Sequence, residues 1–398
     1  MIREDILSDN WPKVRLGDVV EFLDHKRRPI TAKDRIPGPY PYYGANGQQD
    51  SVQGYIFDEP LVLLAEDGGY FGDPDRVIAY QVQGKCWVNN HAHVLKPRPE
   101  INIRYLCRHL EKYDVRPYIN GATREKLNKG IAQEIIISLP PLEEQKRIAA
   151  ILDKADAIRR KRQQTINLTD QLLRSVFLEL FGDPVTNPKG WNTCMFSDLI
   201  DVLTDYHANG SYQALKARVE LKNEKDFALM IRTTDLESGN FNDEVKWVSE
   251  SAYNFLKKTK MYGGEIILNK IGSAGAVYLM PKLGIPVSLA MNQFMIRCNS
   301  ECNNTFAYYY LKTEHGGREM KDRIQGAVTK TITKDAVRSI EFYVPPIDMQ
   351  NRFVDFVQKT KGDLLDKIIR SNFLSESLFS SISQKIFRGE ISKLTEAT

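Results

Sequence analysis

The segment PPLEEQKRIAAIL begins at Pro140, and a close copy, PPIDMQNRFVDFV, begins at Pro345. Two prolines, a glutamine and an arginine recur 205 positions apart (345 minus 140), in the pairs Pro140 and Pro345, Pro141 and Pro346, Gln145 and Gln350, and Arg147 and Arg352. A Pro-Pro pair cannot lie inside a helix, and apolar residues at spacings of three and four follow each pair. The sequence therefore predicts two related helices, one after each Pro-Pro pair.

The repeat extends toward the N-terminus. Trp11 in WPKVRLGDVVEFL matches Trp191 in WNTCMFSDLIDVL, and Gly121-Ala122 matches Gly326-Ala327. The offset grows from 180 at the tryptophans (191 minus 11) to 204 at Gly68 and Gly272 (272 minus 68), so the second copy has roughly 24 extra residues (204 minus 180). We expect two similar lobes related by a pseudo-twofold axis, each followed by a helix. The predicted domains are a first lobe (residues 1–139), a first helix (140–184), a second lobe (185–344) and a second helix (345–398).

The first helix is predicted to start just after Pro141 and to stop at Gly182, because Gly182 and Pro184 form a stop signal. About 39 residues at about 1.5 Å each make a rod of roughly 58 Å. Gly362 is a candidate kink in the second helix. Each apolar stripe needs a partner, so the simpler interpretation is that the two helices pack against each other, and the alternative is that each packs on its own lobe. The basic run 159–162 fits a solvated turn, with contact to DNA or a partner as the alternative.

The lobes are predicted to be α+β. Short strand-like runs such as PLVLLA, CWVNN, EIILNKIG and QFMIRC alternate with turn residues, and helical stretches follow at 104–112 and 306–312. Strands and helices do not alternate regularly, which argues against a doubly wound parallel sheet.

Composition indicates a soluble globular protein. Of the 398 residues, 42% are hydrophobic and 27% charged, and the net charge is +4. No run of about 18 apolar residues predicts a membrane helix, and the charged N-terminus does not resemble a signal peptide. The five cysteines form no CxxC pair, so we expect a reduced, cytoplasmic protein without a zinc site. The small net charge permits nucleic-acid binding through local patches but does not require it.

Catalytic motifs are weak in this sequence. The Pro-Pro pairs are followed by Leu142 and Ile347, whereas an adenine methyltransferase needs an aromatic residue there, and no GxxxxGK[ST] loop occurs. Asp75, Gln83 and Lys85 resemble the pattern of a metal-dependent nuclease, but a glutamine stands where an acid is needed. His91 and His93 alternate along a predicted strand and could form a zinc pair, although hydrogen-bonded structural histidines are the preferred interpretation.

The order of these features resembles the specificity subunit of Type I restriction-modification systems. The residues that carry the resemblance are the lobe openings at Trp11 and Trp191, the segments GATREKLNK and GAVTKTITK, the two Pro-Pro-x-x-x-Gln starts, and the Leu180-Phe181-Gly182 ending. The resemblance covers nearly the whole chain, with a departure at Met349, where the first copy has Glu144. It implies two target-recognition domains and two spacer helices packed as an antiparallel coiled coil.

The resemblance also implies partners and cofactors. The partners are double-stranded DNA, two adenine-N6 methyltransferase subunits and, in complexes that cleave DNA, restriction subunits. No cofactor is expected in this chain, because S-adenosylmethionine belongs to the methyltransferase subunits, and ATP and magnesium belong to the restriction subunits. Each lobe would read one half of a bipartite, asymmetric DNA site, and no membrane would be involved.

Candidate DNA-binding residues follow from side-chain chemistry. Arginine and lysine suit phosphates and guanine edges, while asparagine and glutamine suit adenine edges. The candidates in lobe one are Lys26, Arg27, Asn46 and Gln48, and those in lobe two are Arg232, Thr233, Lys270 and Ser273. Arg124, Lys126, Lys330 and Lys334 are candidates for backbone or partner contacts. Two alternatives remain open: a single-chain metal-dependent DNA nuclease, and a coiled-coil scaffold that does not bind DNA.

Overall fold

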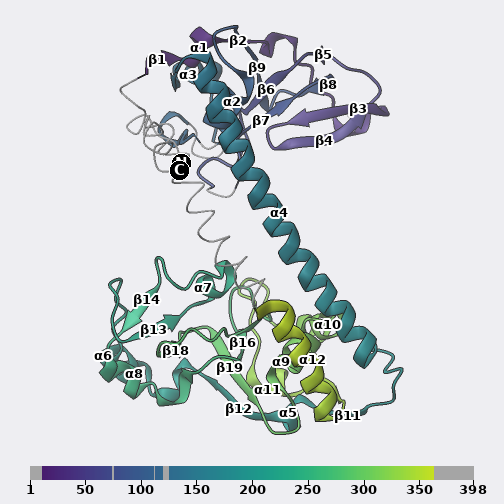
Figure 1. The fold of residues 1–398 in the computed structure, drawn as a ribbon, viewed down its shortest axis with the longest axis vertical. Helices are drawn as coiled ribbons and strands as arrows, with labels where there is room; N and C mark the ends of the chain where they lie inside the picture. The colour runs from purple at the N-terminus through teal and green to yellow at the C-terminus, as the bar shows by residue number, and fades with distance from the viewer. Residues whose placement is uncertain (1–10, 74–75, 112, 120–124, 363–398) are drawn as a thin grey trace. The chain divides into compact units, whose positions relative to one another are not determined.

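The computed structural model describes residues 11–73, 76–111, 113–119 and 125–362. The described chain divides into two compact units, one up to residue 163 and the other from residue 164 onward. Each unit contains one lobe of strands and short helices and one part of the long helix α4 (Leu142–Phe181), as Figure 1 shows. Within the described ranges, no helix is both long and apolar enough to cross a membrane.

The first lobe contains two four-stranded sheets. The antiparallel sheet has the order β2 (Val20–Phe22), β9 (Ala92–Pro97), β6 (Leu61–Ala65) and β7 (Ala79–Val82). The second sheet has the order β4 (Gly47–Val52), β3 (Pro37–Gly44), β8 (Lys85–Val88) and β5 (Phe57–Asp58), and β3 is parallel to β8. The remaining elements are β1 (Lys13–Arg15) paired with β10 (Ile136–Ser138), helices α1 (Leu16–Val19), α2 (Ile103–Leu110) and α3 (Lys129–Gln133), and the 3-10 turns η2 (Asp24–Lys26), η3 (Ala32–Asp34) and η4 (Arg116–Tyr118).

The second lobe also contains two four-stranded sheets. One is antiparallel, in the order β12 (Ile200–Asp205), β19 (Gln293–Cys298), β16 (Ile266–Asn269) and β17 (Val277–Leu279). The other has the order β14 (Lys246–Val248), β13 (Ala228–Ile231), β18 (Val287–Leu289) and β15 (Lys260–Met261), with β13 parallel to β18. The remaining elements are β11 (Asn192–Met195) paired with β20 (Glu341–Val344), helices α5 (Phe196–Leu199), α6 (Tyr212–Arg218), α7 (Thr233–Ser238), α8 (Glu250–Phe255), α9 (Asn304–Leu311), α10 (Glu314–Asp322) and α11 (Lys334–Arg338), and the turns η5 (Tyr206–Asn209) and η6 (Lys257–Thr259).

The two lobes share one topology, which confirms the predicted α+β class and internal repeat. Sheet β12-β19-β16-β17 corresponds strand by strand to β2-β9-β6-β7, and sheet β14-β13-β18-β15 corresponds to β4-β3-β8-β5. The stretch from Val20 to Phe57 spans 37 positions (57 minus 20), and its equivalent from Ile200 to Lys260 spans 60 (260 minus 200). The 23 additional positions (60 minus 37) agree with the expected insertion, and α6, α7 and α8 lie within this stretch.

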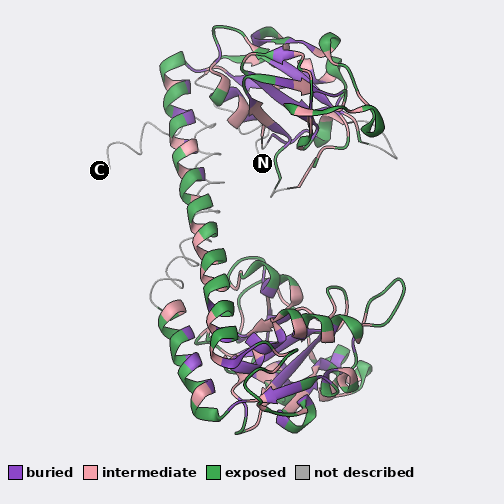
Figure 2. Cartoon of the chain, turned by 90° about the vertical axis from the view of Figure 1, so that its right-hand side faces the viewer, coloured by how far each residue is buried: buried purple, intermediate pink, exposed green. Residues whose placement is uncertain are grey.

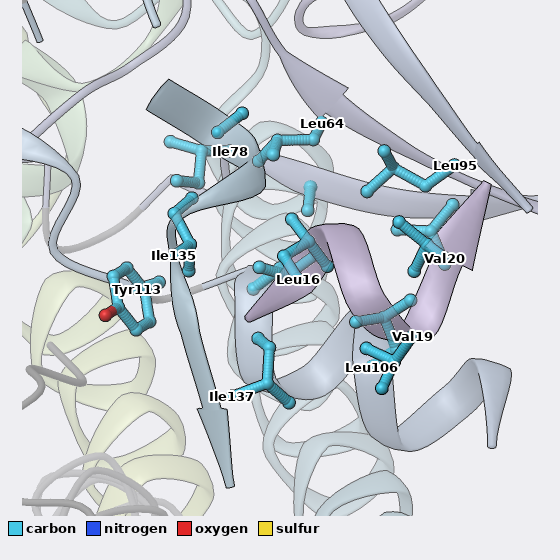
Figure 3. Packing of buried hydrophobic residues seen from close by; sticks show 14 of the residues in the cluster. Leu16, Val19, Val20, Leu64, Ile78, Leu95, Leu106, Tyr113, Ile135 and Ile137 are labelled. Carbon is cyan, nitrogen blue, oxygen red and sulfur yellow. The ribbon is translucent and has the colours of Figure 1, made fainter. Parts of the chain in front are cut away.

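The core of lobe one lies between the antiparallel sheet and the helices beside it. Figure 3 shows Leu64 and Leu95 of the sheet packed with Leu16 of α1 and Leu106 of α2, all of them fully buried. Ile148, Ala149 and Leu152 from the first turns of α4 join this cluster. The N-terminal part of α4 is therefore fixed to lobe one by hydrophobic packing.

The core of lobe two is rich in aromatic rings. Phe177 of α4 lies 5.4 Å from Phe306 of α9 and 5.4 Å from Phe353, as measured between ring centroids. Leu173 and Phe181 of α4 are buried in the same cluster. The alternative, that each helix packs on its own lobe, thus describes the N-terminal end of α4, whereas its C-terminal end packs in lobe two and against Phe353. Between these ends the apolar residues Ile158 and Leu168 are exposed, and Figure 2 shows mostly exposed positions along the middle of the helix.

Helix α4 has the bounds that the sequence predicts, because it begins directly after Pro141 and ends before Gly182. Glu143 and Glu144 lie in its first turn, where the helix dipole favours acidic side chains. Within the basic run, Arg159 and Arg160 both form ion pairs with Asp156, one turn earlier in the same helix. These two arginines therefore support the helix itself.

Helix α12 (Ile347–Thr360) follows the second Pro-Pro pair and packs beside α4 within the second unit. Phe353 contacts Phe177, and Lys361 forms an ion pair of 3.4 Å with Asp170. Because Lys361 follows Phe353 whereas Asp170 precedes Phe177, the two helices run antiparallel here. Lys361 and Gly362 form a π-type turn, and the rest of the predicted second helix lies outside the described residues.

The repeated glutamines explain the Pro-Pro-x-x-x-Gln motif. Gln145 is fully buried, accepts a hydrogen bond from the backbone N–H of Asn102 at 2.7 Å, and donates to the carbonyls of Glu100 and Pro140. Gln350 repeats this pattern with the N–H of Asn303 at 2.8 Å and the carbonyls of Glu301 and Pro345. In each copy one side chain therefore joins the start of the long helix to the backbone that precedes α2 or α9.

Replacing Gln350 with leucine is expected to lower the free energy of unfolding of lobe two by about 3 kcal/mol, because it leaves buried backbone groups without partners. Urea denaturation of the full chain measures this loss. The matched control is Gln358→Leu, since Gln358 is an exposed residue of the same helix. Equal stability of the two variants would contradict the role that we assign to Gln350.

Candidate nucleic-acid interface

The candidate site lies, in each lobe, where β6 or β16 ends. In lobe one the N–H of Glu66 donates to the carbonyl of His91 at 2.9 Å, and the N–H of Leu127 donates to the carbonyl of Glu66 at 2.7 Å. In lobe two the same two bonds join Lys270 to Asn292 at 2.7 Å and Ile332 to Lys270 at 3.1 Å. Three chain segments therefore meet in an identical backbone frame in both lobes.

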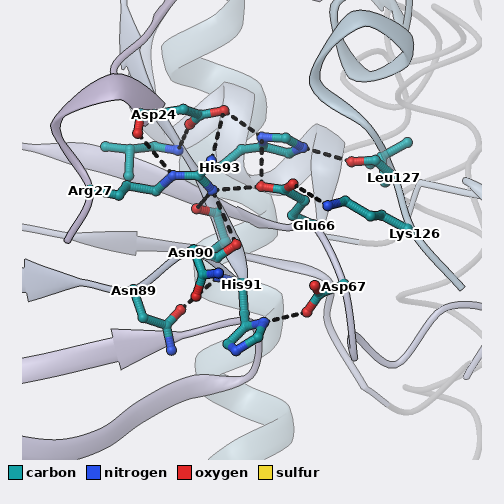
Figure 4. A network of polar contacts seen from close by, with 12 residues as sticks. Asp24, Arg27, Glu66, Asp67, Asn89, Asn90, His91, His93, Lys126 and Leu127 are labelled. Carbon is teal, nitrogen blue, oxygen red and sulfur yellow. Dashed lines mark hydrogen bonds and ion pairs between the residues drawn. The ribbon is translucent and has the colours of Figure 1, made fainter. Parts of the chain in front are cut away.

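A buried ionic cluster occupies this frame in lobe one (Figure 4). The Glu66 carboxylate forms ion pairs of 2.6 Å with Arg27 and 3.0 Å with Lys126. His93 places Nδ1 2.7 Å from the Asp24 carboxylate and Nε2 2.7 Å from the Leu127 carbonyl. Both partners of this ring are groups that accept hydrogen bonds. The cluster joins the turn at Asp24, strand β9 and the segment at Lys126.

Two carboxylates of this cluster are held in their charged form. Burial alone would raise the pKa of Asp24, but His93 and Arg27 more than offset this effect and the pKa lies below its usual value. Burial acts in the same direction on Glu66, and there Arg27 and Lys126 lower the pKa. Ligand atoms of Asp24, Glu66 and His93 lie within 4.8 Å of one another, but Arg27 and Lys126 already neutralise these carboxylates. The cluster is thus a network of ion pairs in which the basic side chains balance the charge of the carboxylates without a metal ion.

The equivalent cluster in lobe two has a different charge pattern. Asp205, which stands where lobe one has Asp24, forms ion pairs with Lys270 at 3.3 Å and Lys334 at 3.2 Å. Burial alone would raise the pKa of Asp205, but the two lysines together lower it by more. The pKa of Asp205 therefore lies below its usual value. Lys270 occupies the backbone position of Glu66, and Phe294 that of His93. The same frame therefore holds an acid in one lobe and a base in the other.

A chain of polar groups continues from this point in lobe two. Asn269 lies 3.4 Å from the Thr233 hydroxyl and donates to the Ser273 hydroxyl at 2.8 Å, and Ser273 donates to Glu237 at 2.6 Å. Arg232 is half-buried, forms a 2.6 Å ion pair with Asp235 and donates to the carbonyl of Glu244. Four of the predicted residues, Arg232, Thr233, Lys270 and Ser273, are thus close to one another.

The structure gathers the lobe-one candidates less completely. Arg27 and Lys126 meet at Glu66, and Asn46 donates to the carbonyl of Gly68, two residues further along the chain, at 2.9 Å. Gln48 lies on β4 and donates to Ser51, while Lys26 is exposed in η2. The Arg27 side chain is mostly buried, and its guanidinium forms an ion pair with Glu66. Arg27 stays a predicted DNA contact, and only the exposed part of its side chain could make that contact.

One further candidate lies in a loop of lobe two. Lys330 is exposed in the loop that Gln325 and Thr331 close through backbone hydrogen bonds. Its neighbour Val328 has 97% of its surface exposed, so this loop projects from lobe two. Arg124, the candidate in the equivalent loop of lobe one, lies outside the described residues, as do Gly121 and Ala122.

Sequence reasoning missed several residues of the site. Glu66 and Asn269 are buried and Asp205 is partly buried, all three at the ends of strands, and apart from Ser273 the partners described above lie 36 to 129 positions away in the chain, beyond the reach of a local motif. Asp67 and His91, which bond to each other, were also missed as a pair. The sequence feature that could have indicated the lobe-one residues is the change from apolar to polar residues after two predicted strands. It occurs after Ala65, in EDGG, and after Val88, in NNH.

The described residues test only one of the two catalytic patterns that the sequence raised, the histidine pair. His91 and His93 bind different carboxylates, Asp67 and Asp24, so the two imidazoles do not form a shared pair. Lys85, the first residue of β8, places Nζ 4.7 Å from the centroid of the Tyr55 ring. Asp75 lies outside the described residues.

Two related lobes of one topology, with different polar clusters in the same frame, define a protein with paired recognition domains. The chain belongs to the family described as Type I restriction modification DNA specificity domain, which matches it twice, at residues 8–168 and 188–372. This result confirms the resemblance that the repeated motifs indicate.

Individual relatives agree with this assignment. An inferred type I restriction enzyme specificity subunit of Haemophilus influenzae is 25% identical over 350 residues, which is 86% of each chain. The type I restriction enzyme MjaVIII specificity subunit of Methanocaldococcus jannaschii is 20% identical over 88% of this chain and 85% of its own length. In structure, the S subunit of a Type I restriction-modification system from M. genitalium superposes with a TM-score of 0.59 at 14% identity and 95% coverage of both chains, which supports the fold.

Proposed function

We propose that this chain is the DNA-recognition subunit of a Type I restriction-modification complex, in which each lobe reads one half of a bipartite, asymmetric DNA site. The main support is the contrast between Glu66 and Lys270, which occupy the same backbone position with opposite charge. A common frame gives both lobes the same mode of docking, and different side chains in that frame give them different base preferences.

Partners supply the chemistry in this proposal. The long helices would pack as an antiparallel coiled coil, set the spacing between the half-sites and dock two adenine-N6 methyltransferase subunits. The contacts of α12 with α4 at Phe353 and Lys361 support the antiparallel arrangement. S-adenosylmethionine would belong to the methyltransferase subunits, ATP and magnesium would belong to restriction subunits, and the proposed place of work is the cytoplasm.

Reconstitution with the methyltransferase subunits tests the proposal. We expect DNA binding that prefers one sequence and weakens as salt rises, because cationic side chains displace counterions from phosphates. Binding without sequence preference would favour the scaffold alternative. The isolated chain, incubated with DNA and magnesium, should not cleave, and cleavage would favour the nuclease alternative.

Lys270→Ala should weaken binding to DNA by about tenfold and reduce the dependence of log K on log salt by about one, if Lys270 contacts a phosphate. Lys282→Ala is the matched control, because Lys282 is an exposed lysine beside Gly263, at the opposite end of β16. Titrations at several salt concentrations measure both quantities. If log K depends on log salt in the same way for the two variants, Lys270 does not contact a phosphate.

A further inference from the structure

His91 of lobe one is held by hydrogen bonds of its backbone and of one ring nitrogen. Its backbone N–H donates to Asn89 Oδ1 at 2.8 Å, and its carbonyl accepts from the N–H of Glu66. Its Nδ1 is hydrogen-bonded to the Asp67 carboxylate, as Figure 4 shows. The side chain is 35% exposed, and Nε2 makes no hydrogen bond to any residue within the described ranges.

The Asp67 carboxylate determines the chemistry of the open nitrogen. An ionised carboxylate only accepts hydrogen bonds, so Nδ1 must carry the proton. In the neutral ring Nε2 is then an acceptor, with a direction fixed by three hydrogen bonds. Because its position is already fixed, the ring loses little conformational entropy when it binds. A fixed acceptor also discriminates between ligands by where their donors lie.

We propose that His91 reads a base in the half-site of lobe one, with Nε2 accepting a hydrogen bond from the exocyclic amino group of adenine or cytosine in the major groove. The inference rests on the proposed function, because it requires lobe one to face DNA. The surroundings support it: Asn46, a predicted base contact, donates to the carbonyl of Gly68 next to Asp67, and Asp67 is bridged through its backbone to Lys126.

Lobe two lacks this device. The positions equivalent to Asp67 and His91 are Ile271 and Asn292, since Ile271 bridges to Thr331 as Asp67 does to Lys126, and the carbonyl of Asn292 accepts from Lys270 as that of His91 does from Glu66. Ile271 has no carboxylate with which to orient a neighbour. The His91 contact is therefore specific to the half-site of lobe one, and the half-site of lobe two serves as an internal control.

Base analogues in the complex reconstituted with methyltransferase subunits test the contact. Each adenine of the first half-site is replaced in turn by purine, and each cytosine by pyrimidin-2-one, so that only the exocyclic amino group is lost. The wild-type complex should lose about tenfold in affinity for DNA at one position, because Nε2 of His91, covered by DNA in the complex, is left without a hydrogen-bond donor. Which analogue has this effect distinguishes adenine from cytosine. His91→Ala should lose less than about twofold at that same position.

Asp67→Asn is the second variant, because it keeps His91 but removes the charge that fixes the tautomer. It should also reduce the loss caused by the analogue, whereas Gln53→Ala, at an exposed residue after β4, should leave it at the wild-type value. If His91→Ala and the wild type lose the same factor at every position, the inference about His91 is wrong while the proposed function stands. If the wild-type complex shows no sequence preference in either half-site, the proposed function itself fails.

Discussion

Exchanging residues 191–344 for the corresponding segment of a relative should change one half of the recognised DNA site and leave the other half intact. Each mismatched base pair costs about 1–3 kcal/mol, so three changed positions should weaken binding to the original site by at least about a hundredfold. Sequencing of methylated adenines before and after the exchange measures both halves in one experiment.

The structure favours clean boundaries for this exchange. The second lobe is closed by the pair β11 and β20, which lies between Gly182 and Pro345. Gln350 joins α12 to the lobe through the backbone of Glu301 and Asn303, and we expect a related lobe of the same fold to supply the same backbone groups. The control is an exchange of the first lobe, which should change the other half-site. A change in both halves after either exchange would contradict modular reading.

Lengthening α4 after Gln163 by seven residues, with the same addition after Gly362, should widen the unread spacer by about three base pairs. Seven residues add about 10.5 Å of helix at about 1.5 Å each, and base pairs are about 3.4 Å apart. The insertion also turns the distal lobe by only about 20°, because each residue contributes about 100° of rotation. The length of the spacer in the methylated motif is the measured quantity.

A five-residue insertion at the same two positions is the matched control. It adds about 7.5 Å of helix but rotates the distal lobe by about 140°, so we expect methylation to be lost. A methylated motif with the original spacer after the seven-residue insertion would refute the spacing role of the helices.

The sequence alone predicted the repeat, because the fold depends on local signals that occur twice. The Pro-Pro pairs start α4 and α12, Gly182 ends α4, and a glutamine in the first turn of each helix is buried in the same way. The α+β class followed from short strand-like runs without regular helices between them. The exact sheet orders did not follow, because β3 pairs with β8 across about 40 residues of intervening chain.

The candidate site was predictable in lobe two and only partly so in lobe one. Lys270 and Ser273 lie in one segment that follows β16, so composition alone indicated them. In lobe one the site that we propose depends on Glu66, Asp67 and His91, which meet only through tertiary contacts. A search for cationic DNA contacts does not select acidic residues or a histidine. It does select Arg27, which stays a predicted DNA contact and forms an ion pair with Glu66 inside the lobe.

The most direct test is to map methylated adenines in cells that express this chain with its methyltransferase partner. Our account predicts a single motif with two unlike halves separated by a fixed number of unread base pairs. A palindromic motif, or an uninterrupted one, would contradict the proposal that two different lobes read two different half-sites.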